Sequence, residues 1–457
     1  MWYCSELDSS KSIHAAVLEA LGEDIGSGKL QPGERMPTQR QLANMINASL
    51  GTANRIYREA ERRGWLTAVV GRGTFVTAGA NDTATMSGME LSPLSLDLGF
   101  PRPMSQGDPM LLTVAKKVFS KSRQSKLASY VSPRGFPGHR AIGADWLSRF
   151  GLKVPPKNVV ITAGAQHALY IICNFLFNKT DCVATDHLTT MGFKAAAQYG
   201  GVRLEGLAMD SEGMLPDELD ALCSRRAIRG VYVSGRLQEP TNAVMSSERR
   251  KALAEVIRRR GLLLVENDAN SALSPTPEAT LTCLLPEQSV YISSFTNIFL
   301  ANLRVAFVTA PEHLIKDLAR GVADTMICVP PLCADIMAEN IGAGHVDETI
   351  ERKRFLLSRR VAAFRKIFQG HEHTCLDWSI RAWLRLPHPV KAAMIAREAD
   401  RRNILLLSPE RFAVGPVPLP EAIPVCLTGV PEMKDLQHAL RTLERVISNS
   451  AKLGQVG

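Results

Sequence analysis

The first eighty residues alternate apolar and polar positions in the way that short helices do. Apolar residues recur at helical spacing between residues 13 and 25, and glycines at 26 and 28 end this pattern. Thr38 is placed to cap a second helix that begins near Gln39, and Ser49 is placed to cap a third, LGTANRIYREAERRGW. The pattern therefore predicts three helices, of which the second and third are separated by a short break at Asn47-Ala48.

A β-hairpin is predicted directly after the third helix. The stretch WLTAVVGRGTFVTA contains two runs rich in β-branched and aromatic residues, on either side of Gly71-Arg72-Gly73. A helix, a helix–turn–helix and a hairpin in this order predict a winged helix-turn-helix over residues 1–78. A domain of this kind inserts the start of its third helix into the major groove of DNA.

The residues that would meet DNA are short or basic. A recognition helix places its N-terminal residues at the base edges, and here these residues are small enough for a close approach. Arginines follow one and two turns later, another lies in the second helix, and one lies at the hairpin tip, where contacts to the DNA backbone are made. The predicted DNA-binding residues are Arg40, Ser49, Leu50, Gly51, Thr52, Arg55, Arg58 and Arg72.

Charge does not carry this prediction. The whole chain has a net charge of +9, but residues 1–80 hold nine Lys or Arg against eight Asp or Glu, so the domain is nearly neutral. The arginines would equally suit an ordinary solvated face. The order and spacing of the elements, rather than an excess of positive charge, indicate DNA binding.

Beyond this domain the pattern changes to that of an α/β protein. Residues 79–93 are small and polar without periodicity, which is typical of a flexible linker. Short buried strands then interleave with helices, and this predicts a large α/β/α lobe over about residues 94–330. Long helices with few strands predict a smaller α+β lobe over about residues 331–457. The predicted strands are NVVITAG, CVATD, GVYVSG, GLLLVEND, SVYISSF and RVAFVTA.

Composition narrows the class of protein further. No apolar run approaches the roughly 18 uncharged residues that a membrane span needs, so no membrane partner is expected. The start of the chain, MWYCSELDSS, carries acids where a secretion signal would carry basic residues, and we expect a cytoplasmic protein. The nine cysteines are scattered without a CxxC pair or a nearby histidine cluster, which predicts reduced thiols and no metal site.

The first domain closely resembles the GntR family of bacterial regulators. The stretches GKLQPGERMPTQRQLA, TANRIYREAERRGWL and GRGTFV follow the order and spacing of that family. The resemblance implies that the partner is double-stranded operator DNA. One departure is Leu50, where the family often has a basic or polar residue. An apolar side chain at this position suits a thymine methyl group.

The body resembles the fold-type I pyridoxal-phosphate (PLP) enzymes, the aspartate aminotransferase superfamily. His139-Arg140 and Asn242 replace the usual Leu-Arg and glycine of its segments. Together with the GntR-like head, the resemblance implies a MocR-type regulator. In such regulators the body usually senses PLP with an amine or amino acid, and dimers often form head to tail. The matching segments are YVSPRGFPGHRAIGADWL, VVITAGAQHAL, QEPTNAVM, LLLVENDANSAL and YISSFTNIFLANLR.

The side chains that perform PLP chemistry in this superfamily are absent at the matching positions. The lysine that forms the Schiff base matches Asn297, and the carboxylate that keeps the pyridine nitrogen protonated matches Asn267. The tyrosine that binds the ring hydroxyl matches Ala269, and the stacking aromatic ring matches Thr190. The arginine that binds the substrate carboxylate falls near Pro424. The resemblance therefore implies no catalytic residue and no covalently bound PLP.

The phosphate side of the same site is retained. Gly164, Ala165 and Gln166 offer backbone N–H groups at a helix N-terminus, an arrangement that binds anions. Ser294 and Arg304 stand where the superfamily has its phosphate-binding serine and arginine. These residues predict an anion or phosphoester site. The same residues would also serve structure alone, with the turn capping its helix and the arginine paired with an acid.

Three functions remain open from the sequence. In the first, the protein is a DNA-binding homodimer whose body senses an unknown small molecule. In the second, the protein is still an enzyme, with PLP held non-covalently and His167 or His187 moving protons. In the third, the body is a scaffold for protein contacts without a ligand. The winged helix and the lost pocket chemistry favour the first, for a protein that is not an enzyme.

Overall fold

The computed structural model describes most of the chain. No cysteine within the described ranges forms a disulfide, and no group of His, Cys, Asp or Glu side chains there is arranged to hold a metal ion. Every helix in these ranges is too short or too polar to span a lipid bilayer. The predicted linker and Arg72 lie outside the described residues, which are Trp2, 12–26, Leu30, 34–62, 65–69, 73–76, 96–102, 104, 109–121, 132–276, 279–415 and 419–454.

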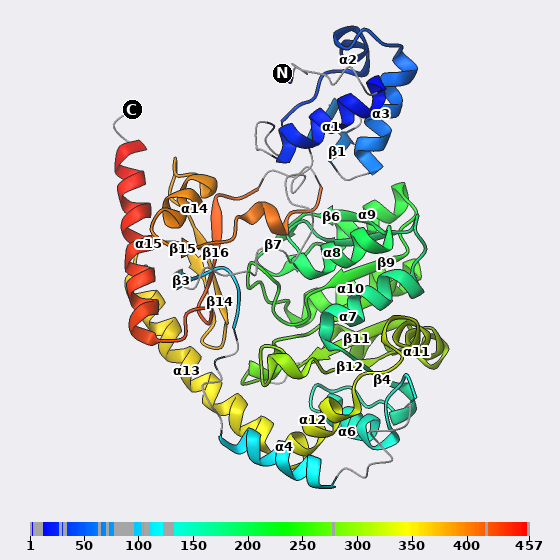
Figure 1. Cartoon of the computed structure of the whole chain (residues 1–457), viewed down its shortest axis with the longest axis vertical. Coiled ribbons are helices and arrows are strands. Elements are labelled where there is room, and N and C mark those ends of the chain that lie inside the picture. The colour runs from blue at the N-terminus through cyan, green and yellow to red at the C-terminus, as the bar shows by residue number, and fades with distance from the viewer. Residues whose placement is uncertain are drawn as a thin grey trace.

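The first domain contains the three predicted helices and the hairpin (Figure 1). Thr38 caps α2, since its hydroxyl oxygen accepts from the Gln41 N–H while the Gln41 side chain accepts from the Thr38 N–H. Buried residues of all these elements, among them Leu18, Ile56 and Val76, form one core. The elements are α1 (Ile13–Gly26), α2 (Gln39–Met45), α3 (Leu50–Arg62), β1 (Leu66–Val69) and β2 (Gly73–Val76).

A seven-stranded sheet forms the centre of the large lobe, in the order β4-β12-β11-β10-β9-β5-β6. β12 runs antiparallel to both of its neighbours, and the other pairs are parallel. All strands but β6 were predicted; β6 lies at the sheet edge and is only partly buried, so its apolar signal is weak. The strands are β4 (Val159–Thr162), β5 (Cys182–Asp186), β6 (Arg203–Leu207), β9 (Gly230–Val233), β10 (Leu263–Asn267), β11 (Ser289–Ser294) and β12 (Ala306–Thr309).

Helices cover both faces of this sheet. Residues alternate along β11, so that Val290 and Ile292 belong to one core and Tyr291 to the other. This is the α/β/α layering that the sequence predicts. The helices are α4 (Pro109–Lys121), α6 (Pro137–Ser148), α7 (Gly164–Ile171), which continues as a π-helix (Ile172–Leu176), α8 (Met191–Gly200), α9 (Pro216–Arg225), α10 (Ser247–Arg260), α11 (Glu312–Met326) and α12 (Pro331–Gly342).

Short elements join these layers. A two-stranded ribbon pairs β7 (Met209–Asp210) with β8 (Gly213–Met214) in antiparallel register. Single turns of 3₁₀-helix occur at Pro156–Asn158, Ser271–Leu273, Leu281–Leu284, Pro286–Gln288, Ala301–Leu303 and Pro409–Phe412.

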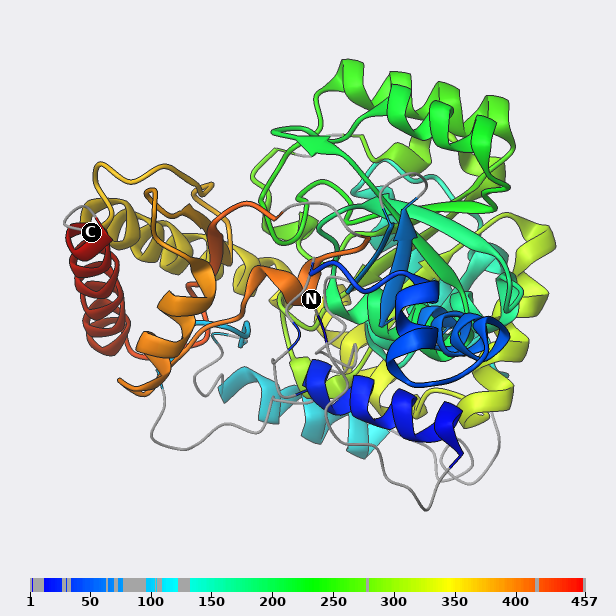
Figure 2. The same ribbon diagram turned by 90° about the horizontal axis from the view of Figure 1, so that it is seen from above.

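The small lobe stands beside the large lobe, and α13 runs from one to the other (Figures 1 and 2). β3 pairs with β15, so the body begins in the small lobe and not in the large lobe as the predicted boundary at residue 94 had it. A two-residue strand is too short to show a period in the sequence. The elements are β3 (Leu96–Asp97), β13 (His373–Thr374), β14 (Arg381–Arg385), β15 (Ile404–Leu405), β16 (Ala422–Cys426), α13 (His345–Ile367), α14 (Ala392–Asp400) and α15 (Met433–Gly454).

Candidate functional site

The N-terminal end of α3 is capped and open to solvent. The Ser49 hydroxyl oxygen accepts a hydrogen bond from the Thr52 backbone N–H at 3.1 Å, and it lies 3.0 Å from the Thr52 hydroxyl. Leu50 is 44% exposed and Gly51 is exposed beside it. The structure therefore brings these four predicted DNA-binding residues together on one open turn, where they are free to approach base edges.

The arginines predicted to contact DNA lie on the surface of the same domain. Arg55 and Arg58 are on the exposed face of α3, whereas Tyr57 on the opposite face is buried. Arg40 is exposed near the start of α2. The prediction for Arg72 falls on a residue outside the described part of the chain.

One exposed arginine of this domain was not predicted. Arg35 forms a single antiparallel β-bridge with Phe75, and the Met36 N–H donates to the Thr74 carbonyl at 2.8 Å, so this segment lies beside β2. The Arg35 Nε lies 3.0 Å from the position that a Cβ would take at Gly73. A bridge made by one residue has no periodicity, so no sequence pattern indicates it.

The second site lies in the body, around the position that matches the PLP lysine. The Asn297 side-chain Nδ2 donates to Asn270 Oδ1 at 3.1 Å. The Asn297 backbone carbonyl accepts from Lys353 Nζ at 3.0 Å, and Lys353 is only 1% exposed. Burial lowers the pKa of Lys353 to about 8. The loop that carries Asn297 is therefore held by two contacts. The Asn297 side chain pairs with Asn270, and the Asn297 backbone carbonyl binds the amine of Lys353. The sequence did not predict this role for Lys353.

A buried tyrosine connects two other positions at which the sequence predicts that a PLP-binding side chain has been replaced. Asn267 Nδ2 donates to the Tyr232 hydroxyl at 3.1 Å, and this hydroxyl lies 2.8 Å from Thr190 Oγ1. The Tyr232 ring stacks on Phe193, with centroids 3.7 Å apart and planes 8° apart. Burial raises the pKa of Tyr232 to about 12, so the phenol is neutral. Asn267 Oδ1 is buried without a hydrogen-bond partner among the described residues.

The carboxylate next to Asn267 faces away from this tyrosine. The Tyr291 hydroxyl donates to Asp268 Oδ2 at 2.7 Å, and Arg236 Nε lies 3.5 Å from the same oxygen. Asp268 is therefore engaged on the opposite side of the strand, as strand alternation requires. It does not supply the negative charge that a protonated pyridine nitrogen needs.

The assignment of the ring-hydroxyl position to Ala269 stays a prediction, but the structure places a polar neighbour of Ala269 beside Asn297. Ala269 was expected to face the pocket because it lies two residues after Asn267. β10 ends at Asn267, so the alternation of a strand does not continue to Ala269. The polar side chain that reaches Asn297 is that of Asn270.

The predicted anion site is assembled around Arg304. Its guanidinium donates to Thr296 Oγ1 at 3.1 Å and to the Ala163 carbonyl at 3.4 Å. A Cβ on Gly164, whose φ is +79°, would lie 2.5 Å from Arg304 Nη2, so only glycine fits there. Ser294 Oγ lies 3.1 Å from Thr296 Oγ1. Arg304 makes no ion pair with a carboxylate of the described residues, and burial lowers its pKa.

The other residues predicted on this side are used in packing. Ala165 packs against the core between the sheet and α7. The Gln166 side chain donates to the Gly192 carbonyl at 2.9 Å. His167 Nδ1 accepts from the Ala163 N–H at 3.0 Å, and its Nε2 lies 2.7 Å from Thr325 Oγ1. Both nitrogens of His167 are thus committed to holding α7, and burial lowers its pKa.

His187 shows no arrangement for proton transfer. Burial lowers the pKa of its imidazole, and its Nδ1 has no hydrogen-bond partner among the described residues. Its backbone N–H donates to the Leu207 carbonyl and its carbonyl accepts from the Val414 N–H. A general base needs a partner that orients it, and none of the described residues does so here.

Two contacts that the sequence did not predict join the lobes. Glu239 on the large lobe forms an ion pair with Arg381 at the start of β14, and Arg381 is 3% exposed. Asn242 Nδ2 donates to the Arg381 carbonyl at 2.7 Å and to the Thr374 carbonyl at 3.1 Å. Pro424, matched to the carboxylate-binding arginine, pairs with Trp383 on β14. The buried cation near Pro424 is therefore Arg381 of β14, and its charge is neutralised by Glu239.

These residues do not fit covalently bound PLP. The position of the Schiff base carries an amide tied to Asn270, the position of the pyridine carboxylate carries an amide tied to Tyr232, and the stacking position carries the Thr190 hydroxyl. The arrangement provides neutral hydrogen-bonding groups and one half-buried cation, Arg304. None of these neutral groups is a nucleophile for a carbonyl.

Comparisons with known proteins identify both parts of the chain. Residues 13–76 match "Bacterial regulatory proteins, gntR family", and residues 94–443 match "Aminotransferase class I and II". The chain therefore belongs to the aminotransferase class I and II family and carries a gntR-family DNA-binding domain in front of it. This combination defines a DNA-binding regulator with an aminotransferase-like domain.

Curated relatives align with most of this chain. The chain is 25% identical, over 98% of its length and 97% of the relative, to the "Uncharacterized HTH-type transcriptional regulator YdeF" of Bacillus subtilis (strain 168). It is 24% identical to the "Probable rhizopine catabolism regulatory protein MocR" of Rhizobium meliloti, over 81% of this chain and 79% of that one. These relatives support a MocR-type regulator.

Solved structures confirm the fold of the body. The α-aminoadipate aminotransferase LysN of Thermus thermophilus superposes with a TM-score of 0.72 at 22% identity, over 80% of this chain and 95% of that one. The predicted winged helix-turn-helix joined to a fold-type I aminotransferase-like domain is therefore confirmed.

Proposed function

We propose that this regulator binds operator DNA as a homodimer, and that its aminotransferase-like domain is catalytically inactive and senses a small molecule other than covalently bound PLP. The observation that carries the proposal is the amide pair between Asn297 and Asn270. An amide is not nucleophilic, so this position forms no Schiff base.

Three further positions support the same conclusion. Neutral hydrogen bonds link Asn267 through Tyr232 to Thr190. In a PLP enzyme of this superfamily, the two end positions would hold a carboxylate for the pyridine nitrogen and an aromatic ring stacked on the cofactor. A carboxylate lost together with the lysine leaves no unpaired charge behind, and an unpaired buried charge is costly. These coordinated replacements are typical of a pocket that has acquired a different ligand.

The ligand proposed for this pocket carries an anionic group. Gly164 and the Thr296 hydroxyl adjoin the Arg304 guanidinium, and the Ser294 hydroxyl lies next to that of Thr296. The guanidinium has no carboxylate partner among the described residues. Such a cation binds a carboxylate or phosphate strongly because both partners are charged. A ligand of this kind would favour the lobe arrangement in which its contacts are complete.

The homodimer follows from the way that winged helices bind DNA. One recognition helix covers one half-site, and a twofold-symmetric pair of heads covers two half-sites related by the same symmetry. A head-to-tail pair, in which each head crosses to the partner's body, would couple ligand binding in the bodies to the spacing of the heads.

Selection of DNA from a random-sequence duplex pool by the full-length protein tests this function. The expected result is a shared sequence with two symmetric half-sites, and a binding constant that falls steeply with salt because phosphate counterions are released. Arg40→Ala and Arg55→Ala should weaken binding without changing the circular dichroism spectrum. Recovery of no shared sequence, or unchanged affinity of both variants, would remove the assignment.

A further inference from the structure

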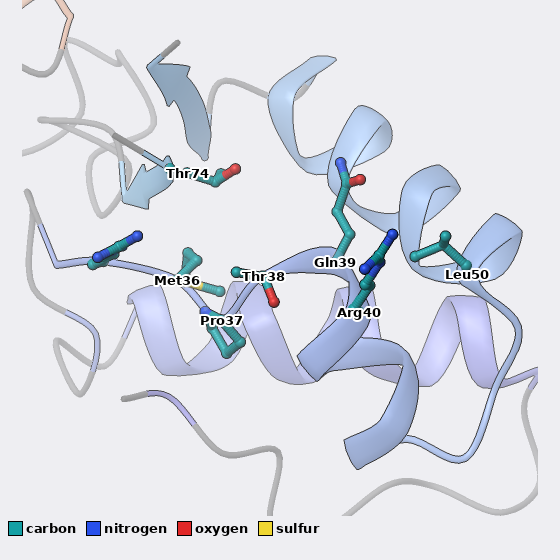
Figure 3. Close-up of a pocket in the computed structure, with 9 residues that line it drawn as sticks. Met36, Pro37, Thr38, Gln39, Arg40, Leu50 and Thr74 are labelled. Atoms are coloured by element: carbon teal, nitrogen blue, oxygen red, sulfur yellow. The ribbon is translucent and has the colours of Figure 1, made fainter. Parts of the chain in front are cut away.

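The net positive charge of the chain lies in the body. The whole chain holds 54 basic and 45 acidic side chains, and residues 1–80 hold nine and eight of these, which leaves 45 against 37 beyond residue 80. The surface assigned to the operator is on the head, where Arg40 and Leu50 lie on one side of a hollow of about 450 Å³ and Thr74 lies on the other (Figure 3). The positive charge of the body is therefore not explained by that surface.

Six exposed arginines gather at the edge of the large sheet where the parallel strands begin. Arg203, the first residue of β6, pairs with Cys182, the first residue of β5. The Arg229 N–H, directly before β9, donates to the Cys182 carbonyl at 2.9 Å. Because β6 and β9 lie on either side of β5, the backbones of Arg203 and Arg229 are about 10 Å apart. The arginine patch consists of Arg203, Arg225, Arg226, Arg229, Arg259 and Arg260.

The ends of α9 and α10 belong to the same patch. Asp220 Oδ1 on α9 lies 2.7 Å from both Arg259 Nη2 and Arg260 Nε on α10, so the two helices are joined near their C-terminal ends. Arg226, directly after α9, forms an ion pair with Glu205 on β6. These ion pairs connect the helix ends to the starts of the strands. The proposed ligand site lies at the opposite edge of the sheet, where the parallel strands end.

The arginine patch holds more positive charge than its neighbours neutralise. Its ion-pair partners within the described chain are Glu205 and Asp220 alone. Arg203, Arg225 and Arg229 form no ion pair with a carboxylate of the described residues. A cation at Arg225, in the last turn of α9, stabilises the helix dipole, but Arg203 and Arg229 begin strands, where this effect does not account for them. Exposed cations in excess over acids create a positive potential that attracts polyanions.

We propose that the arginine patch of the body binds the phosphate backbone of DNA outside the operator half-sites. A guanidinium group donates two hydrogen bonds at once to phosphate oxygens and stays charged at physiological pH. A duplex that the head holds stays close to the body, so the high local concentration of DNA makes a contact effective that is weak by itself. The contact carries no sequence information, because it is made to phosphates. The inference rests on the proposed function, since the head must first hold the duplex.

The test compares the binding of two duplexes by the full-length protein. The short duplex is the one that wild type selects from a random pool, cut at the outer ends of its half-sites. The extended duplex adds several helical turns of unrelated sequence at both ends. Affinity and its salt dependence are measured for wild type, Arg203→Ala/Arg229→Ala and Arg203→Lys/Arg229→Lys. The matched control is Arg441→Ala/Arg445→Ala, which removes two exposed arginines of α15 that form no ion pair within the described chain.

Wild type should bind the extended duplex more tightly than the short one. Arg203→Ala/Arg229→Ala should lose most of this gain and keep the affinity for the short duplex. On the extended duplex, its slope of log K against log salt should be smaller than that of wild type by about 1.8 per subunit, the value for two phosphates. The lysine variant should retain the gain because it keeps both charges. The α15 control should match wild type, and the selected sequence should be the same for all variants.

Two results would overturn the inference while leaving the proposed function intact. In one, Arg203→Ala/Arg229→Ala has the affinity and the salt slope of wild type on the extended duplex, which would leave the patch to an acidic protein partner. In the other, this variant loses the same affinity for both duplexes, so that the effect does not come from the flanking DNA. A wild-type protein that selects no duplex would instead contradict the proposed function itself, which separates the two failures.

Discussion

Asn297 Nδ2 donates a hydrogen bond to Asn270 Oδ1 across 3.1 Å, and Asn297 is the residue that the sequence predicts at the position of the PLP lysine. The backbone carbonyl of Asn297 accepts a hydrogen bond from the amine of the buried Lys353. A lysine does lie beside this loop, but its amine is directed to the backbone. Under the proposed function, this loop carries no reactive amine at position 297.

Restoring the lysine alone should not restore catalysis. With PLP present, Asn297→Lys should transfer no amino groups from a mixture of amino acids to 2-oxoglutarate, because Asn267 supplies no charge to the pyridine nitrogen. The measurement is formation of glutamate, with Asn297→Ala as the background. Turnover above that of Asn297→Ala would show that the remaining pocket still supports the chemistry.

Lys353 should make stability depend on alkaline pH. Below pH 8 the Lys353 amine is charged in both the folded and the unfolded protein, and burial of this charge destabilises the folded state. Between about pH 8 and 10.5 the unfolded chain binds a proton that the folded protein does not, so the stability of the folded state rises with pH. The full difference corresponds to roughly 3 kcal/mol.

Comparison with Lys353→Met isolates this contribution from that of other groups. The urea midpoint of wild type relative to Lys353→Met should rise between pH 7 and pH 9.5, because methionine fills a similar volume without titrating. A difference between the two proteins that stays constant with pH would mean that the Lys353 pKa is not lowered.

Asn242→Gly should loosen the contact between the lobes. The substitution removes two hydrogen bonds to small-lobe carbonyls, each worth about 1 kcal/mol, and glycine adopts the observed φ of +62° without strain. Amide hydrogen exchange in β14 should become faster and the thermal midpoint should fall. Asn403→Gly is the matched control, since Asn403 has a φ of +57° and an exposed side chain. Equal effects of both substitutions would assign the loss to the backbone.

Arg304 should make the body sensitive to phosphate. Inorganic phosphate at ten times its dissociation constant would stabilise the folded protein by about 1.4 kcal/mol. The thermal midpoint of the body should therefore be higher in phosphate than in sodium chloride of the same ionic strength, and Arg304→Gln should abolish this difference. Lys316→Gln should retain it. If Arg304→Gln responds to phosphate as wild type does, the cation has only a structural role.

The elements of the fold were largely predictable because each has a local signal. The Thr38 capping box and the Ser49 cap fixed the starts of α2 and α3, and six buried strands appeared as short apolar runs. The edge strand β6 and the two-residue β3 lack such a signal. Local patterns are enough for elements that bury a whole face.

The contacts of the sites were less predictable because they join distant parts of the chain. Glu239 and Arg381 are separated by 142 positions, and no periodicity relates them. Lys353 lies among charged residues of α13 and gives no apolar signal, although it is buried. Asn270 was missed because the end of β10 decides which side chain turns toward Asn297. Such details depend on tertiary packing, which a single sequence does not specify.

The most direct test of the central claim is an absorbance spectrum of the purified full-length protein, recorded before and after addition of excess PLP. The account predicts no aldimine band in the purified protein and, after addition, only the spectrum of free PLP. A shifted band that saturates with PLP and is lost on reduction with borohydride, which leaves a pyridoxyl group attached to a lysine, would contradict it, since the body would then bind PLP covalently without a lysine at position 297.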